Sequence, residues 1–223
     1  MLPSQALNGG QTCIAPHYLL VAESVKSELL QLMKAKLEEI GYSDSAEHYT
    51  SVINKRNFDR VTSLIDKDKM FYGGKTNEET LYIEPAIMDN VTWDDAVMQE
   101  EIFGPVFPVI SFSNYDDVLQ KIIDGEKPLT AYLFTKYNGE KSKLLNLVSF
   151  GGGCINDTLM HIASDYLPLG GIGNSGIGNY HGEYGFVSFF HQKSVIDKAT
   201  WGMPDWKYPP YTDKKMKWLK QVM

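Results

Sequence analysis

The chain has 223 residues, of which 28 are acidic and 21 basic, and its formal net charge is −7. That length suffices to bury a sizeable core, and the acidic balance without a Lys/Arg cluster argues against nucleic acid as a partner. Two cysteines, Cys13 and Cys154, are too few for a disulfide framework or a zinc site, so no metal is expected. The sequence contains neither a secretory signal nor an apolar run of membrane-spanning length, so a cytoplasmic or organelle-associated protein is expected.

Short apolar, β-branched runs alternate with amphipathic stretches along the chain. Runs of the first kind predict strands at residues 17–22, 81–88, 106–112, 131–134 and 153–156. Stretches of the second kind predict helices at residues 24–40, 54–65, 114–124 and 139–148. Alternation of strands and helices is typical of an α/β domain with a largely parallel sheet.

Particular residues set the expected ends and irregularities of these elements. Ser24 is placed to cap the first helix and Gly41 to close it. Pro85 and Pro108 lack the amide hydrogen that a sheet ladder uses, so neither of their strands is expected to be a regular central strand throughout. A last strand is predicted at residues 187–196, ahead of a tail rich in Pro, Trp and Tyr.

Cys13 is the candidate nucleophile of this sequence. It ends the run N-G-G-Q-T-C at residues 8–13, in which the glycines allow close backbone approach to a ligand and Gln and Thr make a poor core environment. A single cysteine is more often a core residue, and Cys154, inside a predicted strand, keeps that interpretation. The run at residues 8–13 resembles the G-Q-x-C segment that carries the nucleophilic cysteine of the aldehyde dehydrogenase superfamily.

A second run, E-E-I-F-G-P-V, occupies residues 100–106 and leads into a predicted strand. Judged by itself, the acidic pair is most simply a solvated surface feature. The E-I-F-G-P pattern, however, resembles a specific segment of the same superfamily. The resemblance implies that Glu101 accepts hydrogen bonds from the hydroxyls of a nicotinamide ribose and that Phe103 lies against the nicotinamide face. NAD or NADP is therefore the implied cofactor.

The glycine-rich run at residues 167–178 contains a literal G-x-G-x-x-G. We do not interpret it as a dinucleotide fingerprint, because a proline precedes it and no helical pattern follows it. It is similar instead to a loop near the active site of the superfamily. The patterns N-D-T-x-M-H, G-N-x-H-G and K-Y-P-P are most similar to the class-3, fatty-aldehyde branch. The chemistry of that branch needs no histidine, so His161 and His181 receive no role.

The resemblance covers nearly the whole chain and implies a three-layer αβα catalytic domain of aldehyde dehydrogenase type at residues 1–186. A bridging and oligomerisation strand at 187–200 and a tail at 201–223 would follow it, and full-length relatives are expected to form homodimers. The implied reaction is oxidation of an aldehyde, aliphatic or fatty, to a carboxylate. Cys13 would form a thiohemiacetal and then a thioester, with its own backbone amide as one oxyanion donor.

Two segments that the superfamily uses have no match in the sequence: the one with the glutamate base and the one with the oxyanion-binding asparagine. Only twelve residues precede Cys13, so the dinucleotide-binding domain is expected to be missing and the chain to be inactive by itself. Two alternatives remain open. The chain could be a non-catalytic subunit or interaction module that offers a free strand edge at residues 188–195. It could also be a cysteine hydrolase that pairs Cys13 with His181.

Overall fold

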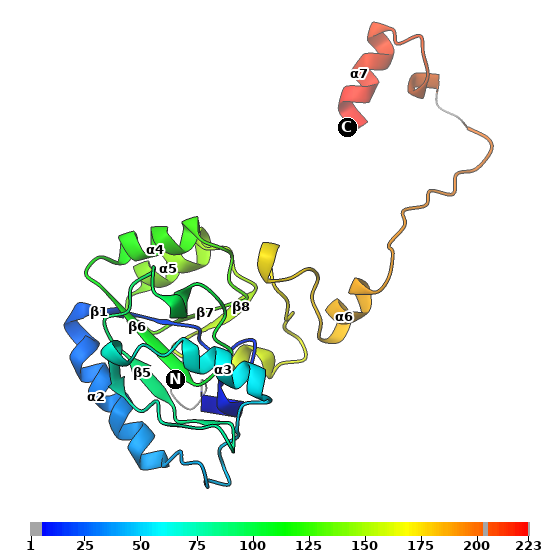
Figure 1. The fold of residues 1–223 in the computed structure, drawn as a ribbon. Helices are drawn as coiled ribbons and strands as arrows, with labels where there is room; N and C mark the ends of the chain where they lie inside the picture. Colours follow the sequence, from blue (N-terminus) through cyan, green and yellow to red (C-terminus); the bar gives the residue numbers. More distant parts are fainter. Residues whose placement is uncertain (1–5, 203–204, 223) are drawn as a thin grey trace. The chain divides into compact units, whose positions relative to one another are not determined.

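The computed structural model of the protein describes residues 6–202 and 205–222. The chain divides into two compact units, Met1–Phe189 and Phe190–Met223. The strands of the first unit are β1 (Leu19–Ala22), β2 (Met70–Tyr72), β3 (Thr76–Asn77), β4 (Tyr82–Ile83), β5 (Ala86–Met88), β6 (Val106–Phe112), β7 (Thr130–Leu133) and β8 (Gly152–Ile155) (Figure 1). Its α-helices are α2 (Glu23–Ile40), α3 (Lys55–Ser63), α4 (Tyr115–Asp124), α5 (Asn138–Leu147) and α6 (Gly182–Ser188). The second unit contains a single-turn helix, Asp205–Lys207, and the helix α7 (Asp213–Val222).

The strands form one four-stranded sheet and two pairs. The four-stranded sheet has the order β1-β6-β5-β2, in which β6 runs parallel to both β1 and β5 and β2 is antiparallel to β5. β7 and β8 form a parallel pair, and β3 and β4 an antiparallel pair. Parallel strands need long crossover connections: α2 and α3 lie between β1 and β6, α5 lies between β7 and β8, and a loop with the single helical turn Ala96–Met98 connects β5 to β6. The predicted α/β class with a largely parallel sheet is confirmed.

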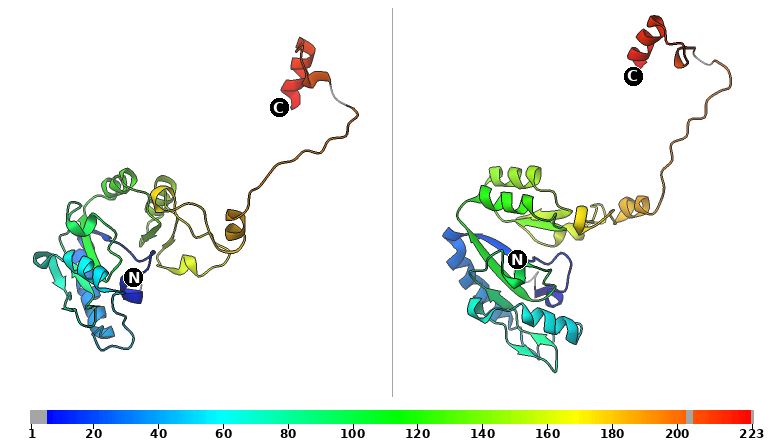
Figure 2. Two further views of the ribbon diagram at one scale, coloured as in Figure 1. Left: turned by 45° about the vertical axis from the view of Figure 1, so that its right-hand side comes forward. Right: turned by 45° about the horizontal axis from the view of Figure 1, so that its top comes forward.

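Helices cover both faces of the four-stranded sheet, because alternate residues of β5 and β6 face two different cores. The core on the α2 side contains Val21, Leu30, Met33, Ile87, Phe107 and Val109. The core on the α3 side contains Phe58, Val61, Ala86, Met88, Val106 and Ile110. Helix, sheet and helix therefore form three layers (Figure 2), which is the arrangement that buries both apolar faces of a sheet.

A third, smaller core joins α4 and α5 to the β7–β8 pair. Its buried members are Leu119, Leu144 and Val148, with Leu133 and Ile155 of the two strands packed against them. α4 begins where the sequence predicts, since the side chain of Asn114 accepts a hydrogen bond from the Asp116 backbone N–H and so caps the helix.

The ends of α2 confirm one predicted residue and correct another. Gly41 ends the helix with φ 69 and donates its N–H to Leu37 O, as the sequence predicts. Ser24, in contrast, is not the N-cap. Helix α2 follows β1 without a linker, so Ala22 is the capping residue and has no side-chain hydrogen bond to offer. Glu23 in the first turn instead complements the positive end of the helix dipole.

The two prolines affect their strands differently. Pro85 separates β4 from β5, as predicted. Pro108 lies inside β6, which runs without interruption through the centre of the sheet, so the prediction was wrong for this strand. The register explains the tolerance: β6 pairs with β1 only from Val109 onward, and Pro108 has a strand partner, Met88, on one side alone.

The strand predicted at residues 187–196 is not found. Its first two residues belong to α6, and residues 189–200 form neither helix nor strand. A strand is stabilised by hydrogen bonds to a neighbour, and the described residues provide no strand beside this segment. The role of residues 187–200 as a bridge between subunits stays a prediction. Within the described part of the chain, no helix combines the length and the apolar character needed to cross a membrane.

Candidate functional site

The candidate nucleophile lies in a loop that begins with a tight turn of left-handed backbone. We call residues 8–16 the nucleophile loop. Asn8, Gly9 and Gly10 have φ values of 53, 62 and 74, three consecutive left-handed residues. A Cβ added at Gly10 would lie 2.2 Å from Gly104 O. The two glycines thus serve the tight turn and the close approach to residue 104, as expected of glycines at such positions.

Gln11 fastens the nucleophile loop to the segment that precedes α3. Its side-chain Nε2 donates to Ser51 O at 3.1 Å, and its Oε1 accepts from the Ile53 N–H at 2.9 Å. A side-chain amide can make both bonds at once because it carries a donor and an acceptor. Gln11 received no role from the sequence, although a polar amide in a run that makes a poor core environment was a signal for one.

Cys13 itself is exposed, whereas Cys154 in β8 is half-buried. A turn closed by the bond from Ala15 N–H to Thr12 O, 2.9 Å long, places Cys13 and Ile14 at its two central positions. The side chain of Ile14 is buried, with 2% of its surface exposed. The turn therefore anchors one central residue in the core and presents the other to solvent.

The second signature segment is held by α3. We call residues 100–105 the acidic loop. Arg60 donates from Nη1 to Glu101 O at 2.9 Å and from Nη2 to Ile102 O at 2.6 Å, and its Nη1 lies 3.6 Å from the Glu100 carboxylate. Because the guanidinium engages backbone carbonyls, the side chain of Glu101 stays exposed.

Phe103 is held outward by a strained backbone. Its φ is 47, an uncommon value for a bulky residue, and 41% of its surface is exposed. The neighbouring residues enforce this conformation. Ile102 is 2% exposed, and a Cβ added at Gly104 would lie 2.7 Å from Cγ1 of Val61 in α3. Strain of this kind at an exposed aromatic side chain points to a functional position.

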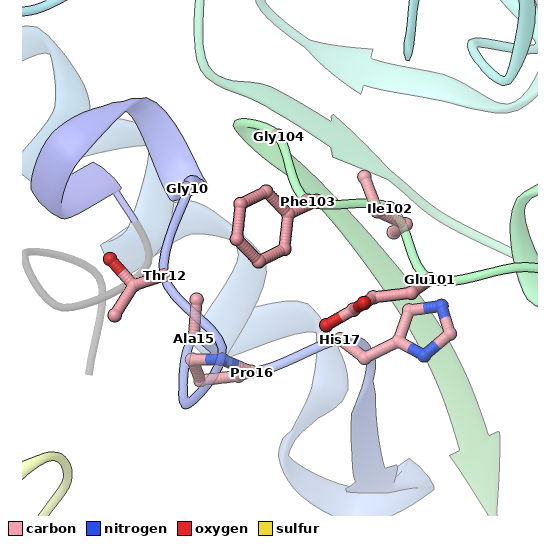
Figure 3. A pocket seen from close by; sticks show the side chains of 9 residues that line it. All are labelled: Gly10, Thr12, Ala15, Pro16, His17, Glu101, Ile102, Phe103 and Gly104. Atoms are coloured by element: carbon pink, nitrogen blue, oxygen red, sulfur yellow. The ribbon is translucent and has the colours of Figure 1, made fainter. Parts of the chain in front are cut away.

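The two loops line one hollow (Figure 3), together with His17, two residues before β1. Figure 3 shows the Phe103 ring beside Gly10 and the Glu101 carboxylate beside His17. Burial lowers the pKa of His17, and the nearby Glu101 charge partly opposes that shift. No pattern in the sequence marked His17.

The hollow is suited to the edge of a ligand and not to enclosing one. Its volume is about 10 Å³, about the space of one water molecule. An exposed carboxylate that can accept hydrogen bonds from two hydroxyls and an exposed aromatic face stand at its rim, and a nicotinamide riboside requires such an acceptor and such a stacking surface. The side chains of Glu101 and Phe103 fit such a group bound at the surface of this unit.

The glycine-rich run at residues 167–178 folds as a closed loop. Leu169 and Tyr180 form an antiparallel bridge, and a Cβ added at Gly171 would lie 2.2 Å from Ser175 O. Within residues 167–178 the structure has no strand and only the single helical turn Gly173–Ser175. The strand–turn–helix context of a dinucleotide fingerprint is absent from this described segment, in agreement with the sequence interpretation.

Neither histidine considered in the sequence is joined to Cys13. His181 Nδ1 lies 3.1 Å from Leu167 O, across the mouth of the glycine-rich loop. His161 Nδ1 lies 3.6 Å from Cys154 Sγ, and burial lowers the pKa of His161. No hydrogen bond in the described residues connects His181 with Cys13, so nothing favours a cysteine hydrolase built from this pair.

Comparison with known proteins identifies one family. A family model described as "Aldehyde dehydrogenase family" matches residues 1–195. The 4,4'-diaponeurosporen-aldehyde dehydrogenase of Staphylococcus aureus is 43% identical over 218 residues, which are 96% of this chain and 47% of that protein. Aldehyde dehydrogenase family 3 member A2 of Rattus norvegicus is 39% identical over 219 residues, 96% of this chain and 45% of that protein. The chain therefore spans about half the length of the curated relatives it matches.

The fold is similar to that of a solved structure as well. The substrate-bound state of Staphylococcus aureus AldH superimposes with a TM-score of 0.89 at 41% sequence identity, over 98% of this chain and 48% of that chain. The similarity in sequence and in fold thus extends over nearly all of the 223 residues, and includes the class-3 branch that the sequence patterns indicated.

Proposed function

Because the chain belongs to the aldehyde dehydrogenase family, we propose that it supplies the nucleophile and the nicotinamide-end contacts for an NAD(P)-dependent oxidation of aldehydes to carboxylates. The observation that carries the proposal is the contact between the two loops. At Gly10 and Gly104 their backbones approach so closely that a Cβ on the first would lie 2.2 Å from the carbonyl of the second. Cys13 therefore directly follows Thr12, which lines the same hollow as Glu101 and Phe103 (Figure 3).

Cys13 begins the reaction as a thiolate. Its sulfur bonds to the aldehyde carbon, and the carbonyl oxygen becomes an alkoxide that accepts a hydrogen bond from the Cys13 backbone N–H. The nicotinamide, when bound, accepts the hydride that leaves this carbon. Cys13 then carries a thioester, which water cleaves to release the carboxylate and restore the thiol.

Glu101 and Phe103 orient the nicotinamide end in this proposal. The Glu101 carboxylate accepts hydrogen bonds from the ribose hydroxyls, and Phe103 offers its exposed face to the ring. Arg60 keeps both groups in place through the carbonyls of Glu101 and Ile102. The geometry matters because a hydride acceptor must sit within about 3–3.5 Å of the reacting carbon.

We propose aliphatic or fatty aldehydes as the substrate class and a homodimer as the assembly of the complete enzyme. The substrate class rests on the patterns N-D-T-x-M-H and G-N-x-H-G at residues 156–161 and 178–182 and on the relatedness to family 3 member A2. The assembly rests on the family resemblance alone.

Saturation-transfer NMR with NAD tests the nicotinamide contacts. The protons of the nicotinamide are expected to receive more saturation than those of the adenine, because Glu101 and Phe103 contact only the nicotinamide end. The variants Glu101→Ala and Phe103→Ala should abolish this difference, whereas Asp117→Ala, which removes an exposed carboxylate from α4, should leave it intact. Stronger saturation of the adenine, or a pattern that neither variant changes, would contradict the proposal.

A further inference from the structure

A tyrosine from a distant strand is bonded to the turn that presents Cys13. Tyr132 belongs to β7, and its Oη donates a hydrogen bond to Ile14 O at 2.9 Å across 118 residues of sequence. Ile14 is the residue after Cys13 and the second central residue of the turn closed by Ala15 and Thr12. The bond therefore acts on the same short turn that contains the proposed nucleophile.

The surroundings of Tyr132 fix its ring. Cys154 is its partner across the β7–β8 pair, so both side chains lie on one face of the strands. The ring of His161 packs edge-on against Tyr132, with centroids 5.9 Å apart, and Nδ1 of His161 lies 3.6 Å from Cys154 Sγ. The side chains of Tyr132, Cys154 and His161 thus form one packed cluster next to the nucleophile loop.

The phenol remains a hydrogen-bond donor across the physiological range. Burial raises the pKa of Tyr132 to about 12, and the neighbouring thiols of Cys154 and Cys13 add to the increase. A protonated phenol can donate to a carbonyl oxygen, whereas a phenolate cannot.

We propose that Tyr132 is a positioning residue for Cys13. Its hydrogen bond to the Ile14 carbonyl fixes the turn, and with it the direction of the Cys13 backbone N–H, which donates a hydrogen bond to the oxyanion. The inference rests on the proposed function, since it assumes that Cys13 attacks a carbonyl. In this scheme Tyr132 contacts neither the substrate nor the sulfur of Cys13, and it acts only through the backbone of the nucleophile loop.

Two reactions of Cys13 distinguish an effect on the position of its backbone N–H from an effect on the exposure of its sulfur. With p-nitrophenyl acetate, the sulfur bonds to the acetyl carbon, the ester C–O bond breaks, p-nitrophenolate leaves with the electron pair, and the thiol proton passes to solvent. This acyl transfer passes through an oxyanion. Iodoacetamide reacts by displacement of iodide at a saturated carbon and forms no oxyanion. The first rate depends on the backbone N–H, whereas the second depends on thiolate fraction and access.

The Tyr132→Phe variant keeps the ring and removes only the hydroxyl. We expect the Cys13-dependent burst of p-nitrophenolate to slow about fivefold, as loss of one hydrogen bond of about 1 kcal/mol implies, while alkylation of Cys13 by iodoacetamide stays within about twofold. Tyr115→Phe is the matched control, since it removes a similar bond from a tyrosine to a backbone carbonyl, Tyr115 Oη to Glu140 O at 3.2 Å, in the α4–α5 region. It should change neither rate.

An unchanged burst in Tyr132→Phe would overturn the inference, and so would an equal slowing of both reactions, which would indicate general loosening. Failure of the proposed function gives a different result, namely no burst above a Cys13→Ala control in the wild type. Hydrogen exchange over residues 11–18 then decides the role of Tyr132. Exchange about fivefold faster in Tyr132→Phe than in Tyr115→Phe would support the positioning role, and equal exchange would overturn it.

Discussion

At the scale of single residues, the candidate site depends on backbone positions that no side chain can occupy. Gly10 and Gly104 are the clearest cases, because one backbone lies against the other and Gly104 lies against Val61 of α3. These glycines bring together two segments separated by about ninety positions in the sequence. The nucleophile and the nicotinamide contacts are neighbours for this steric reason.

Gly10→Ala is therefore expected to destabilise the protein by about 2 kcal/mol or more. The alanine would have to adopt φ 74, which costs about 1 kcal/mol, and its Cβ would lie 2.2 Å from a backbone carbonyl that cannot move aside easily. Gly139→Ala is the control, since its Cβ meets nothing within 4 Å and its position lies inside α5, where alanine stabilises by about 0.5–1 kcal/mol. Urea unfolding measures both. Equal midpoints for the two variants would refute the steric account.

At the scale of secondary-structure elements, α3 has two tasks. Its inner face, with Phe58 and Val61, covers one side of the sheet, and Arg60 at its last turn holds the acidic loop. The loop is attached to the helix mainly through the backbone carbonyls of Glu101 and Ile102. Its shape therefore depends on the guanidinium, while the side chains of Glu101 and Phe103 stay exposed. The same helix thus joins the stability of the core to the geometry of the hollow.

Arg60→Gln should loosen the acidic loop without unfolding the core. Two charge-assisted hydrogen bonds would be lost, each worth about 1.5–3 kcal/mol to the local structure, so hydrogen exchange over residues 100–105 should accelerate at least tenfold. Arg56→Gln, on the exposed side of the same helix, is the control and should leave exchange unchanged. Equal hydrogen-exchange rates over residues 100–105 in the two variants would show that Arg60 does not hold the loop.

The sequence predicted helices α2 to α5 and strands β1, β6, β7 and β8, and the three-layer architecture followed from the family resemblance. β6 and α2 were predictable because their apolar residues recur at strand and helix spacing, and Gly41 was predictable as a helix end because its left-handed φ needs glycine. Ser24 failed as a cap because α2 follows β1 directly. The strand at residues 187–196 failed because apolar, β-branched content shows only the capacity to pair, while pairing needs a neighbour.

The candidate site was predictable only where a family pattern exists. Cys13, Glu101 and Phe103 followed from the resemblance, and the structure brings the two segments that carry them together at Gly10 and Gly104. Their roles remain proposals. Arg60 and Tyr132 could not have been found, because each acts on a backbone carbonyl far away in sequence. Hydrogen bonds between residues far apart in the chain leave no local pattern in the sequence.

At the scale of the whole molecule, the 223-residue chain is expected to oxidise no aldehyde when it is studied alone. The sequence contains no match to the family segments with the glutamate base and the oxyanion-binding asparagine. Loss of a general base costs about 10²–10⁴-fold in rate, and loss of an oxyanion donor about 10²–10³-fold. The hollow is also too shallow to hold a dinucleotide, since its volume is about 10 Å³.

The chain alone should therefore produce no absorbance at 340 nm with NAD or NADP and a series of aliphatic aldehydes, beyond that of a Cys13→Ala control. Turnover that depends on Cys13 would show that the residues present suffice for the complete reaction. In that case the roles assigned to the unmatched base and oxyanion donor would have to be filled by side chains of this chain.

The assignment of Cys13 as the nucleophile is the central claim, and brief alkylation of the native protein by iodoacetamide, followed by mass spectrometry, tests it most directly. Cys13 is exposed on a glycine-flanked turn and Cys154 is half-buried in β8, and access together with thiolate fraction controls the rate. The account predicts that Cys13 is labelled first and that an aliphatic aldehyde, by adding reversibly to its sulfur, slows this labelling and leaves that of Cys154 unchanged. Preferential labelling of Cys154, or no protection of Cys13 by the aldehyde, would contradict it.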